Sequence, residues 1–452
     1  MGRMDNLLYI ETEKDVLDAW LWNRSMEKLK KALGKDKREI YWLGDFFQFI
    51  EELFRDNKSL SVKDFKIIIN LYKNRNIWNQ SINEYMKEYL RHYIKEDLKK
   101  RLWEEYISVL YEFINGLKIS NNGFVGIWEK EYKFLVEKMW YPIIEEYLLF
   151  IDNNLRSLLE NINKKIKKIG VRQDYIEFVN FLKVNNKINS KKELIVFMKE
   201  IDKNIRWFLK KQNILDNIDK VKFNIKITPK ELENVIPFAE YRHKKIYKNL
   251  EENVWYITFD SQNWENYKES FIDTYIHEFI PGHAYFYFRM LDNEWFKEFT
   301  LGDTFIDNLI VEGWALYAEK LMDEVGYYDK YMSLAVDIYI LLRIVRMKID
   351  ALLQTNKINF DQAVKMLMEY MGYDKKLAIS EVTRYSLYPW LPSSYYMWFT
   401  LVRNMRKDFF RKKKRDFLFF HKDLFKFLSD LNKKKIKNVK EILSLWNEYT
   451  KI

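Results

Sequence analysis

Apolar residues recur every three or four positions over most of the chain, which is the period of an amphipathic helix. From residue 1 to about 215 the pattern runs through successive segments, for example Tyr106, Leu110 and Phe113, and a polar Asn185-Asn186 pair interrupts it. The 452 residues include only 12 glycines and 6 prolines, which is about 4% of the chain. In an average protein these two residue types together make up roughly 12%. Because these residues end helices, their scarcity predicts long helices.

The pattern changes after about residue 218. Residues 221–227 alternate between apolar and polar side chains, with the period of two expected of a half-buried strand. A second run rich in strand-forming residues, Val254–Phe259, precedes a histidine cluster, and the helical pattern returns at about residue 262. We predict a mostly α fold with a small β-sheet next to the active site. An exposed edge of that sheet would offer an extended peptide main-chain hydrogen bonds.

The same change suggests a division of the chain, because 452 residues exceed one compact core of ordinary size. Residues 1–217 are predicted to form an N-terminal helical region that carries no recognisable chemistry. Residues 218–452 are predicted to form the metal-binding catalytic region. The two regions are expected to share one cleft, either as separate domains or as one fold.

Composition narrows the chemistry and the cellular location. The chain has no cysteine, so only histidines and carboxylates remain as strong metal ligands. Its net charge of +11 reflects 77 basic and 66 acidic residues of interspersed sign, so we interpret the short basic runs as solvated helix faces and expect no nucleic-acid partner. No apolar run approaches the roughly 18 residues of a membrane helix, and the first residues do not resemble a secretory signal. We therefore expect a soluble, cytoplasmic protein with no membrane partner.

Two of the five histidines lie within one seven-residue segment, His277-Glu278-Phe279-Ile280-Pro281-Gly282-His283. The zinc-peptidase motif HExxH places two histidines one helical turn apart, with the glutamate as general base. Here the second histidine comes six positions later and would point about 120° away on an ideal helix. A bend at Pro281-Gly282 would bring both imidazoles to one ion. Alternatively, Pro-Gly ends the helix and His283 packs elsewhere.

The helix that leads to this segment has one polar stripe, which consists of Ser270, Asp273, Thr274 and His277. Apolar residues cover most of its remaining surface. A helix with this distribution is typical of the protein interior, with the polar stripe facing a cavity. This pattern favours a functional role for His277 over that of an ordinary core histidine.

Catalytic zinc usually has three protein ligands, and Glu312 is the candidate for the third. Leu309, Glu312 and Leu316 share one apolar helix face, so this carboxylate is predicted to be buried. Burial of an unpaired carboxylate is costly, whereas a bound cation compensates it. Glu319, two turns further on, either orients a ligating imidazole or pairs with basic residues at the surface.

These motifs resemble, in order along the chain, a family of candidate zinc metallopeptidases known as domain of unknown function 885. The resemblance covers about residues 235–406 and includes HExxPGH, the glutamate-rich segment Glu312–Glu319, the segment Glu381–Tyr385, and Pro389 with Ser394-Tyr395. It implies a mostly helical, elongated fold with a deep cleft, similar to other helical zinc peptidases. It also implies one zinc ion bound by the histidine segment and by the glutamate that begins EGWALYAE.

Carried over to this sequence, the resemblance implies that His277, His283 and Glu312 bind zinc and that Glu278 is the general base. Tyr395 and Arg384 match positions suited to the cleft wall, where a tyrosine hydroxyl could stabilise an oxyanion and an arginine could bind a peptide carboxylate. Tyr395 is alternatively one of many core tyrosines. Arg406 matches a further family arginine with a weaker claim.

The chain departs from the family pattern at several positions. Ala284-Tyr285-Phe286 follows His283 where a second histidine and a glutamine are usual, and Trp390 stands in place of a glycine after Pro389. Trp398 replaces another typical glycine, and Gln354 replaces a common histidine. Because these changes introduce larger aromatic side chains, they predict a reshaped pocket and leave the specificity of relatives in doubt.

The sequence therefore predicts a zinc-dependent peptidase that acts on a peptide substrate, as a carboxypeptidase or an oligopeptidase. In this hypothesis Glu278 accepts a proton from the attacking water and returns it to the leaving amine. The alternative is a metal-bearing, catalytically inactive peptide-binding protein. Oligomeric state is not readable from the sequence.

Overall fold

The computed structural model describes residues 82–95, 104–117 and most of 125–450, together with a few isolated positions before residue 125. Within the longest stretch, the gaps are residues 139–140, 142, 171–173, 223, 228–238, 243–253, 258, 260–265, 292–303, 414–415, 432–435 and 437. The chain divides into two compact units. One unit contains Met1–Trp128 and Ile379–Pro389, and the other contains Glu129–Ala378 and Trp390–Ile452. The predicted division between residues 217 and 218 stays a prediction.

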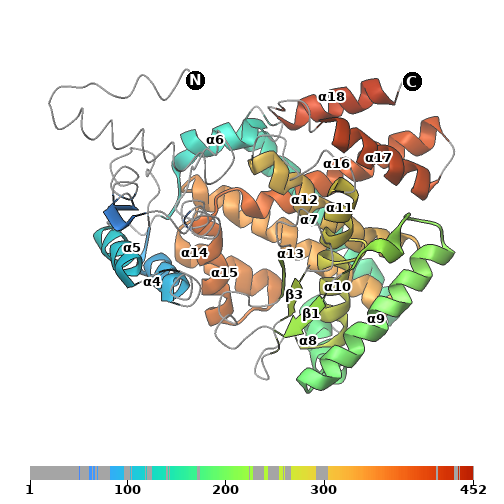
Figure 1. The fold of residues 1–452 in the computed structure, drawn as a ribbon, viewed down its shortest axis with the longest axis horizontal. Coiled ribbons are helices and arrows are strands. Elements are labelled where there is room, and N and C mark those ends of the chain that lie inside the picture. The colour runs from blue at the N-terminus through green and yellow to red at the C-terminus, as the bar shows by residue number, and fades with distance from the viewer. Residues whose placement is uncertain are drawn as a thin grey trace. The chain divides into compact units, whose positions relative to one another are not determined.

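Helices dominate both units, and the prediction of a mostly α fold is confirmed (Figure 1). The first unit contains α4 (Glu84–Tyr93) and α5 (Glu104–Gly116), and most of α15 (Lys375–Leu387) lies in its second segment. The remaining helices belong almost entirely to the second unit and are α6 (Trp128–Lys138), α7 (Ile144–Ile169), α8 (Tyr175–Asn185), α9 (Lys191–Lys211), α10 (Lys268–Glu278), α11 (His283–Leu291), α12 (Thr304–Glu324), α13 (Lys330–Gln354), α14 (Phe360–Met371), α16 (Leu391–Lys412), α17 (Phe417–Leu431) and α18 (Val439–Tyr449).

Local polar signals set the ends of several helices. Asp174 begins α8 with a capping box, in which its side chain accepts from the backbone of Glu177 and Glu177 bonds back. The side chain of Ser190 caps α9 by accepting from the backbone N–H of Glu193, and α7 ends at Gly170 in the left-handed conformation. Helix α8 ends at the predicted Asn185-Asn186 break. These caps satisfy backbone groups that have no partner within the helix.

The core of the second unit is built around α12, α13 and α16, which contact one another, and α7 packs on α13. Gly313 of α12 lies directly against Trp398 of α16, where an added Cβ would be 2.3 Å from the Trp398 Cβ. Because glycine has no side chain, it lets the two helix backbones approach closely at this point. Helices α12 and α16 are therefore closely packed next to Glu312, the residue before Gly313.

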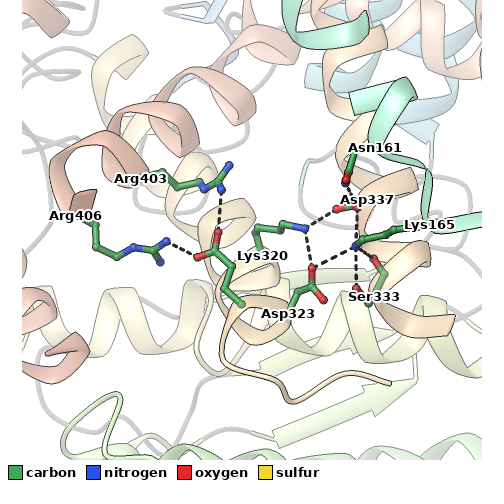
Figure 2. Close-up of polar contacts among 9 residues, drawn as sticks. Asn161, Lys165, Lys320, Asp323, Ser333, Asp337, Arg403 and Arg406 are labelled. Carbon is green, nitrogen blue, oxygen red and sulfur yellow. Dashed lines mark hydrogen bonds and ion pairs between the residues drawn. The ribbon is translucent and has the colours of Figure 1, made fainter. Parts of the chain in front are cut away.

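A buried ion-pair network joins α7, α12 and α13 in the second unit (Figure 2). Asp337 is 1% exposed and accepts from Lys165 at 2.7 Å and from Lys320 at 2.5 Å. Asn161 also donates to Asp337, and Lys320 reaches Asp323 at 2.7 Å. A buried carboxylate with two cationic partners and an amide donor is compensated. The network therefore fixes the positions of three helices relative to one another.

A three-stranded sheet lies in the same unit, in the order β1-β3-β2. The strands are β1 (Asn224–Ile227), β2 (Ala239–Arg242) and β3 (Val254–Ile257). Strand β3 pairs in parallel with β1 and antiparallel with β2, and β2 packs against α10. The strand predicted from alternation corresponds to β1, and the one predicted from the run of strand-forming residues corresponds to β3, whereas β2 has no clear signal in the sequence.

Candidate metal centre

The histidine segment forms a corner between two helices. Helix α10 ends at Glu278, and α11 begins at His283 after a short connection that includes a cis Ile280–Pro281 peptide bond. An added Cβ on Gly282 would lie 1.9 Å from the carbonyl oxygen of His277, so only glycine fits there. Trp314 of α12 donates to the Pro281 carbonyl at 2.9 Å. The corner is therefore stabilised by the close packing of Gly282 on the end of α10 and by the hydrogen bond from α12.

This corner brings the two imidazoles together. The rings of His277 and His283 are 4.7 Å apart between centroids and nearly perpendicular, at 85°. One oxygen of Glu312, Oε2, lies 3.5 Å from His277 Nε2 and 3.6 Å from His283 Nε2. The alternative in which His283 packs elsewhere does not agree with this geometry.

The donor set fits a tetrahedrally bound cation. Ligand bonds of about 2.0–2.2 Å place two donors of a tetrahedral zinc site roughly 3.3–3.6 Å apart. Both distances from Glu312 Oε2 are of this length, and the oxygen is buried without a hydrogen-bond partner. His277, Glu278 and His283 also have potential ligand atoms within 4.8 Å of one another. Glu312 is the better third ligand, because a single oxygen of its side chain faces both Nε2 atoms.

The charges around His277 favour a cation at this point. His277 Nδ1 lies 2.6 Å from Oε1 of Glu319, which is fully buried. Burial lowers the pKa of His277, but Glu312 and Glu319 outweigh burial and raise it to about 10. For Glu312, burial raises the pKa, yet the positive charges of His283 and His277 hold it well below its usual range. The location of Glu319 excludes a surface pairing and fits a residue that orients the ligand.

Two further residues complete the surroundings of Glu319. Asp273 of α10 is buried, and burial together with the charge of Glu319 raises its pKa well above the ordinary value. Arg343 of α13 places a guanidinium nitrogen 3.7 Å from Glu319 Oε1. The polar stripe of α10 had indicated Asp273 as a residue facing a cavity, whereas nothing in the sequence distinguished Arg343 from other arginines.

Tyr395 of α16 lies beside the ligands. Its ring stacks at 25° to the ring of His277, with centroids 6.2 Å apart, and the Arg343 guanidinium lies over it at 5.7 Å. It is therefore a neighbour of the metal centre rather than a tyrosine of the distant core. Its role in a reaction stays a prediction.

The two other arginines have different surroundings. Arg384 belongs to the first compact unit, where it donates to Glu381 at 3.0 Å. Its proposed role in substrate binding stays a prediction. Arg406 hydrogen-bonds to the Tyr317 hydroxyl at 3.1 Å and also pairs with Glu324 (Figure 2).

The departures from the family pattern occupy packed positions. Trp398 is fully buried against Gly313. The backbone N–H of Trp390, which precedes α16, donates to Asp350 at 3.0 Å. Gln354 is also buried and hydrogen-bonds to Asp350. These residues therefore contribute to the packing of α12, α13 and α16.

Comparison with solved structures supports the fold. A candidate lipoprotein from Colwellia psychrerythraea is 17% identical, with a TM-score of 0.63 over 97% of this chain and 72% of its own. A candidate lipoprotein of unknown function from Shewanella oneidensis is 16% identical, with a TM-score of 0.59 over 96% and 84%. Metallocarboxypeptidase 1 of Trypanosoma cruzi reaches 12% identity and a TM-score of only 0.37 over 97% and 86%, a likeness on which no argument rests. None of the curated proteins matches the chain.

The expectation of a cytoplasmic location is wrong by this comparison. The two solved structures with TM-scores of 0.63 and 0.59 are both described as candidate lipoproteins, which points away from the cytoplasm. Among the helices that the structure describes, none is long and apolar enough to cross a membrane.

The family assignment rests on sequence. Residues 151–427 match the sequence model of a family described as bacterial proteins of unknown function, DUF885. The matched region contains every proposed metal ligand and Tyr395. The match covers more than half of the chain, and this protein therefore belongs to the DUF885 family.

Proposed function

We propose that this protein is a zinc-dependent peptidase in which His277, His283 and Glu312 hold one zinc ion. The observation that carries the proposal is the position of Glu312 Oε2, a buried oxygen without a hydrogen-bond partner beside two histidine Nε2 atoms. Two imidazoles and a carboxylate are a ligand set of catalytic zinc in peptidases, and three protein ligands leave a fourth position open. Bound zinc supplies a Lewis acid that acidifies water and polarises a peptide carbonyl.

Glu278 is the proposed general base. It directly follows His277, and its carboxylate lies within 4.8 Å of potential ligand atoms of both histidines. From there it accepts a proton from the attacking water and later donates it to the leaving amine. We further propose that Tyr395, whose ring stacks beside that of His277, donates a hydrogen bond from its hydroxyl to the developing oxyanion. The proposed substrate is a peptide, cleaved by an oligopeptidase or a carboxypeptidase mode of action.

The test combines metal analysis with peptide hydrolysis. Purified protein is assayed for zinc content and for cleavage of a peptide library that includes free and blocked carboxyl ends. Glu278→Gln is expected to retain zinc and to lower kcat by about 10²–10⁴-fold, because general acid–base catalysis is lost. Glu369→Gln is the matched control, since this side chain is 61% exposed on α14.

The outcomes separate the candidate functions. Cleavage only of peptides with a free carboxyl end would assign a carboxypeptidase, and cleavage of both kinds an oligopeptidase. Zinc binding with tight peptide binding but no cleavage would assign the inactive peptide-binding protein instead. Wild-type protein that binds no zinc would sink the proposal.

A further inference from the structure

Arg343 lies between two residues of the metal centre that come from different helices. Its guanidinium is 3.7 Å from Glu319 Oε1 on α12 and 5.7 Å from the ring centroid of Tyr395 on α16. Only 14% of the Arg343 side chain is exposed. An arginine guanidinium is planar and permanently charged, so one face can stack on an aromatic ring while its edge pairs with a carboxylate.

The same oxygen of Glu319 serves both Arg343 and the ligand His277. Glu319 Oε1 lies 2.6 Å from His277 Nδ1, and the Glu319 side chain is fully buried. A buried carboxylate needs a nearby positive charge or hydrogen bonds to compensate for its burial. Arg343 is the cation that the structure places beside this oxygen.

We propose that Arg343 is a positioning residue that couples the metal ligand to Tyr395. Its positive charge holds Glu319 in the orientation that fixes the ring of His277, and its contact with Tyr395 holds the tyrosine ring beside that imidazole. One side chain on α13 thus sets the relative position of His277 on α10 and Tyr395 on α16. The inference rests on the proposed function, in which His277 binds zinc and Tyr395 contacts the substrate.

The arrangement differs from a substrate-binding arginine. A guanidinium that receives a peptide carboxylate needs its edge free for two parallel hydrogen bonds. In Arg343 one terminal nitrogen lies 3.7 Å from Glu319 Oε1, and the guanidinium lies over the Tyr395 ring, so both of these contacts are made within the protein. Arg343 is therefore expected to influence zinc affinity and kcat rather than the KM for peptides.

The test compares Arg343→Gln, Arg343→Lys and the control Arg403→Gln. Arg403 is 43% exposed on α16, the helix that carries Tyr395, and it pairs with Glu324 (Figure 2). Zinc affinity is measured by competition with a chromophoric chelator. Arg343→Gln is expected to weaken zinc binding by about 10–100-fold, the usual effect of removing support behind a ligand. Arg403→Gln should retain wild-type affinity.

Arg343→Lys separates the two contacts of this residue. A lysine keeps the charge beside Glu319 but has no planar face, so zinc affinity is expected to fall less than in Arg343→Gln while kcat falls. A double-mutant cycle tests whether Arg343 acts on zinc binding through Glu319. In a Glu319→Gln background, Arg343→Gln should weaken zinc binding by less than it does in wild type, because the two residues act through one contact.

Each outcome has a defined meaning. Wild-type zinc affinity in a folded Arg343→Gln protein, or additive effects in the cycle, would overturn the inference. A raised KM for peptides with unchanged zinc affinity would also overturn it and would assign Arg343 to the substrate. If Arg343→Gln fails to fold, as judged by circular dichroism, Arg343→Lys and Tyr395→Phe carry the test. In that case Tyr395→Phe should lower kcat at unchanged zinc affinity, and loss of activity from Arg343→Lys should be smaller in that background.

Failure of the proposed function gives a different result. Zinc binding without hydrolysis of any peptide would remove the peptidase proposal, yet the affinity measurements would still decide the role of Arg343. Wild-type protein without zinc affinity would overturn both.

Discussion

At the residue scale, the buried carboxyl group of Asp350 combines several hydrogen bonds with a shifted pKa. Asp350 of α13 accepts hydrogen bonds from the Tyr132 hydroxyl at 2.7 Å, from the Ser393 hydroxyl at 3.1 Å and from the backbone of Trp390. Burial raises the pKa of Asp350 to about 7, although these hydrogen bonds oppose the rise. The hydrogen bonds from Trp390 and Ser393 link Asp350 to the start of α16, the helix that carries Tyr395. The raised pKa means that the carboxyl group is neutral in weak acid.

Asp350 should make the protein less stable as pH rises. Its pKa is about 7 in the folded chain and 3.8 when exposed, so between these values the folded state binds more protons than the unfolded state. Stability from this group is present below pH 4 and is lost as pH rises through 7. From urea unfolding, wild type should lose about 2–3 kcal/mol more between pH 5 and pH 8 than Asp350→Asn does. The control Asp152→Asn, at a side chain that is 45% exposed, should show the same pH dependence of stability as wild type. If Asp350→Asn also shows the wild-type pH dependence, the raised pKa of Asp350 is contradicted.

At the scale of secondary-structure elements, the junction of α10 and α11 decides whether two histidines become one site. An ideal helix would direct His277 and His283 apart, but the chain breaks after Glu278 and restarts at His283. Gly282 makes the close return possible, because its backbone lies against the carbonyls of Ile276 and His277. The corner therefore depends on a missing side chain as much as on the ligands.

Gly282→Ala tests this dependence. The added methyl group would lie 1.9 Å from the His277 carbonyl oxygen, so the corner has to open and His283 has to move. Zinc affinity is expected to fall by at least about tenfold, comparable with loss of support behind a ligand. Gly326→Ala is the control, because Gly326 has a left-handed backbone with φ of 79° and no atom within 4 Å of the added methyl. It should cost about 1–2 kcal/mol of stability and leave zinc affinity unchanged; equal zinc affinity in both variants would refute the role of the corner.

At the scale of the whole molecule, the candidate ligands come from three helices of one compact unit. His277 ends α10, His283 begins α11 and Glu312 lies within α12. A cation bound by all three would link these helices, and the ion-pair network around Asp337 already links α12 to α7 and α13. Metal binding is therefore expected to be coupled to the stability of the unit.

Zinc should stabilise the wild-type protein against heat and urea. At free zinc about 1,000-fold above its Kd, the gain is about 4 kcal/mol, because the ion binds the folded state. His283→Asn should lose this gain, whereas His92→Gln should keep it, since His92 lies on α4 in the other unit. Differential scanning calorimetry with and without a chelator measures the effect, and equal zinc-dependent shifts in wild type and His283→Asn would contradict the ligand assignment.

The sequence by itself determined the helical class and pointed to the candidate metal ligands. Apolar spacing and scarce glycine and proline report local helix formation, and the scarcity of histidine makes the pair at His277 and His283 conspicuous. The apolar face around Glu312 indicated burial, which the position of its Oε2 bears out. These features are visible in sequence because they depend on neighbours within about two helical turns.

Only the tertiary structure decided how these residues meet. The sequence did not reveal strand β2, the contact of Gly313 with Trp398, or the choice of Arg343 among the arginines. Each depends on segments far apart in the chain, which local periodicity does not report. The bend at Pro281-Gly282 was predicted as a possibility, but its direction is set by packing of Gly282 on the end of α10 and by Trp314 of α12. Residue type thus gives the chemistry, and packing between distant helices gives its geometry.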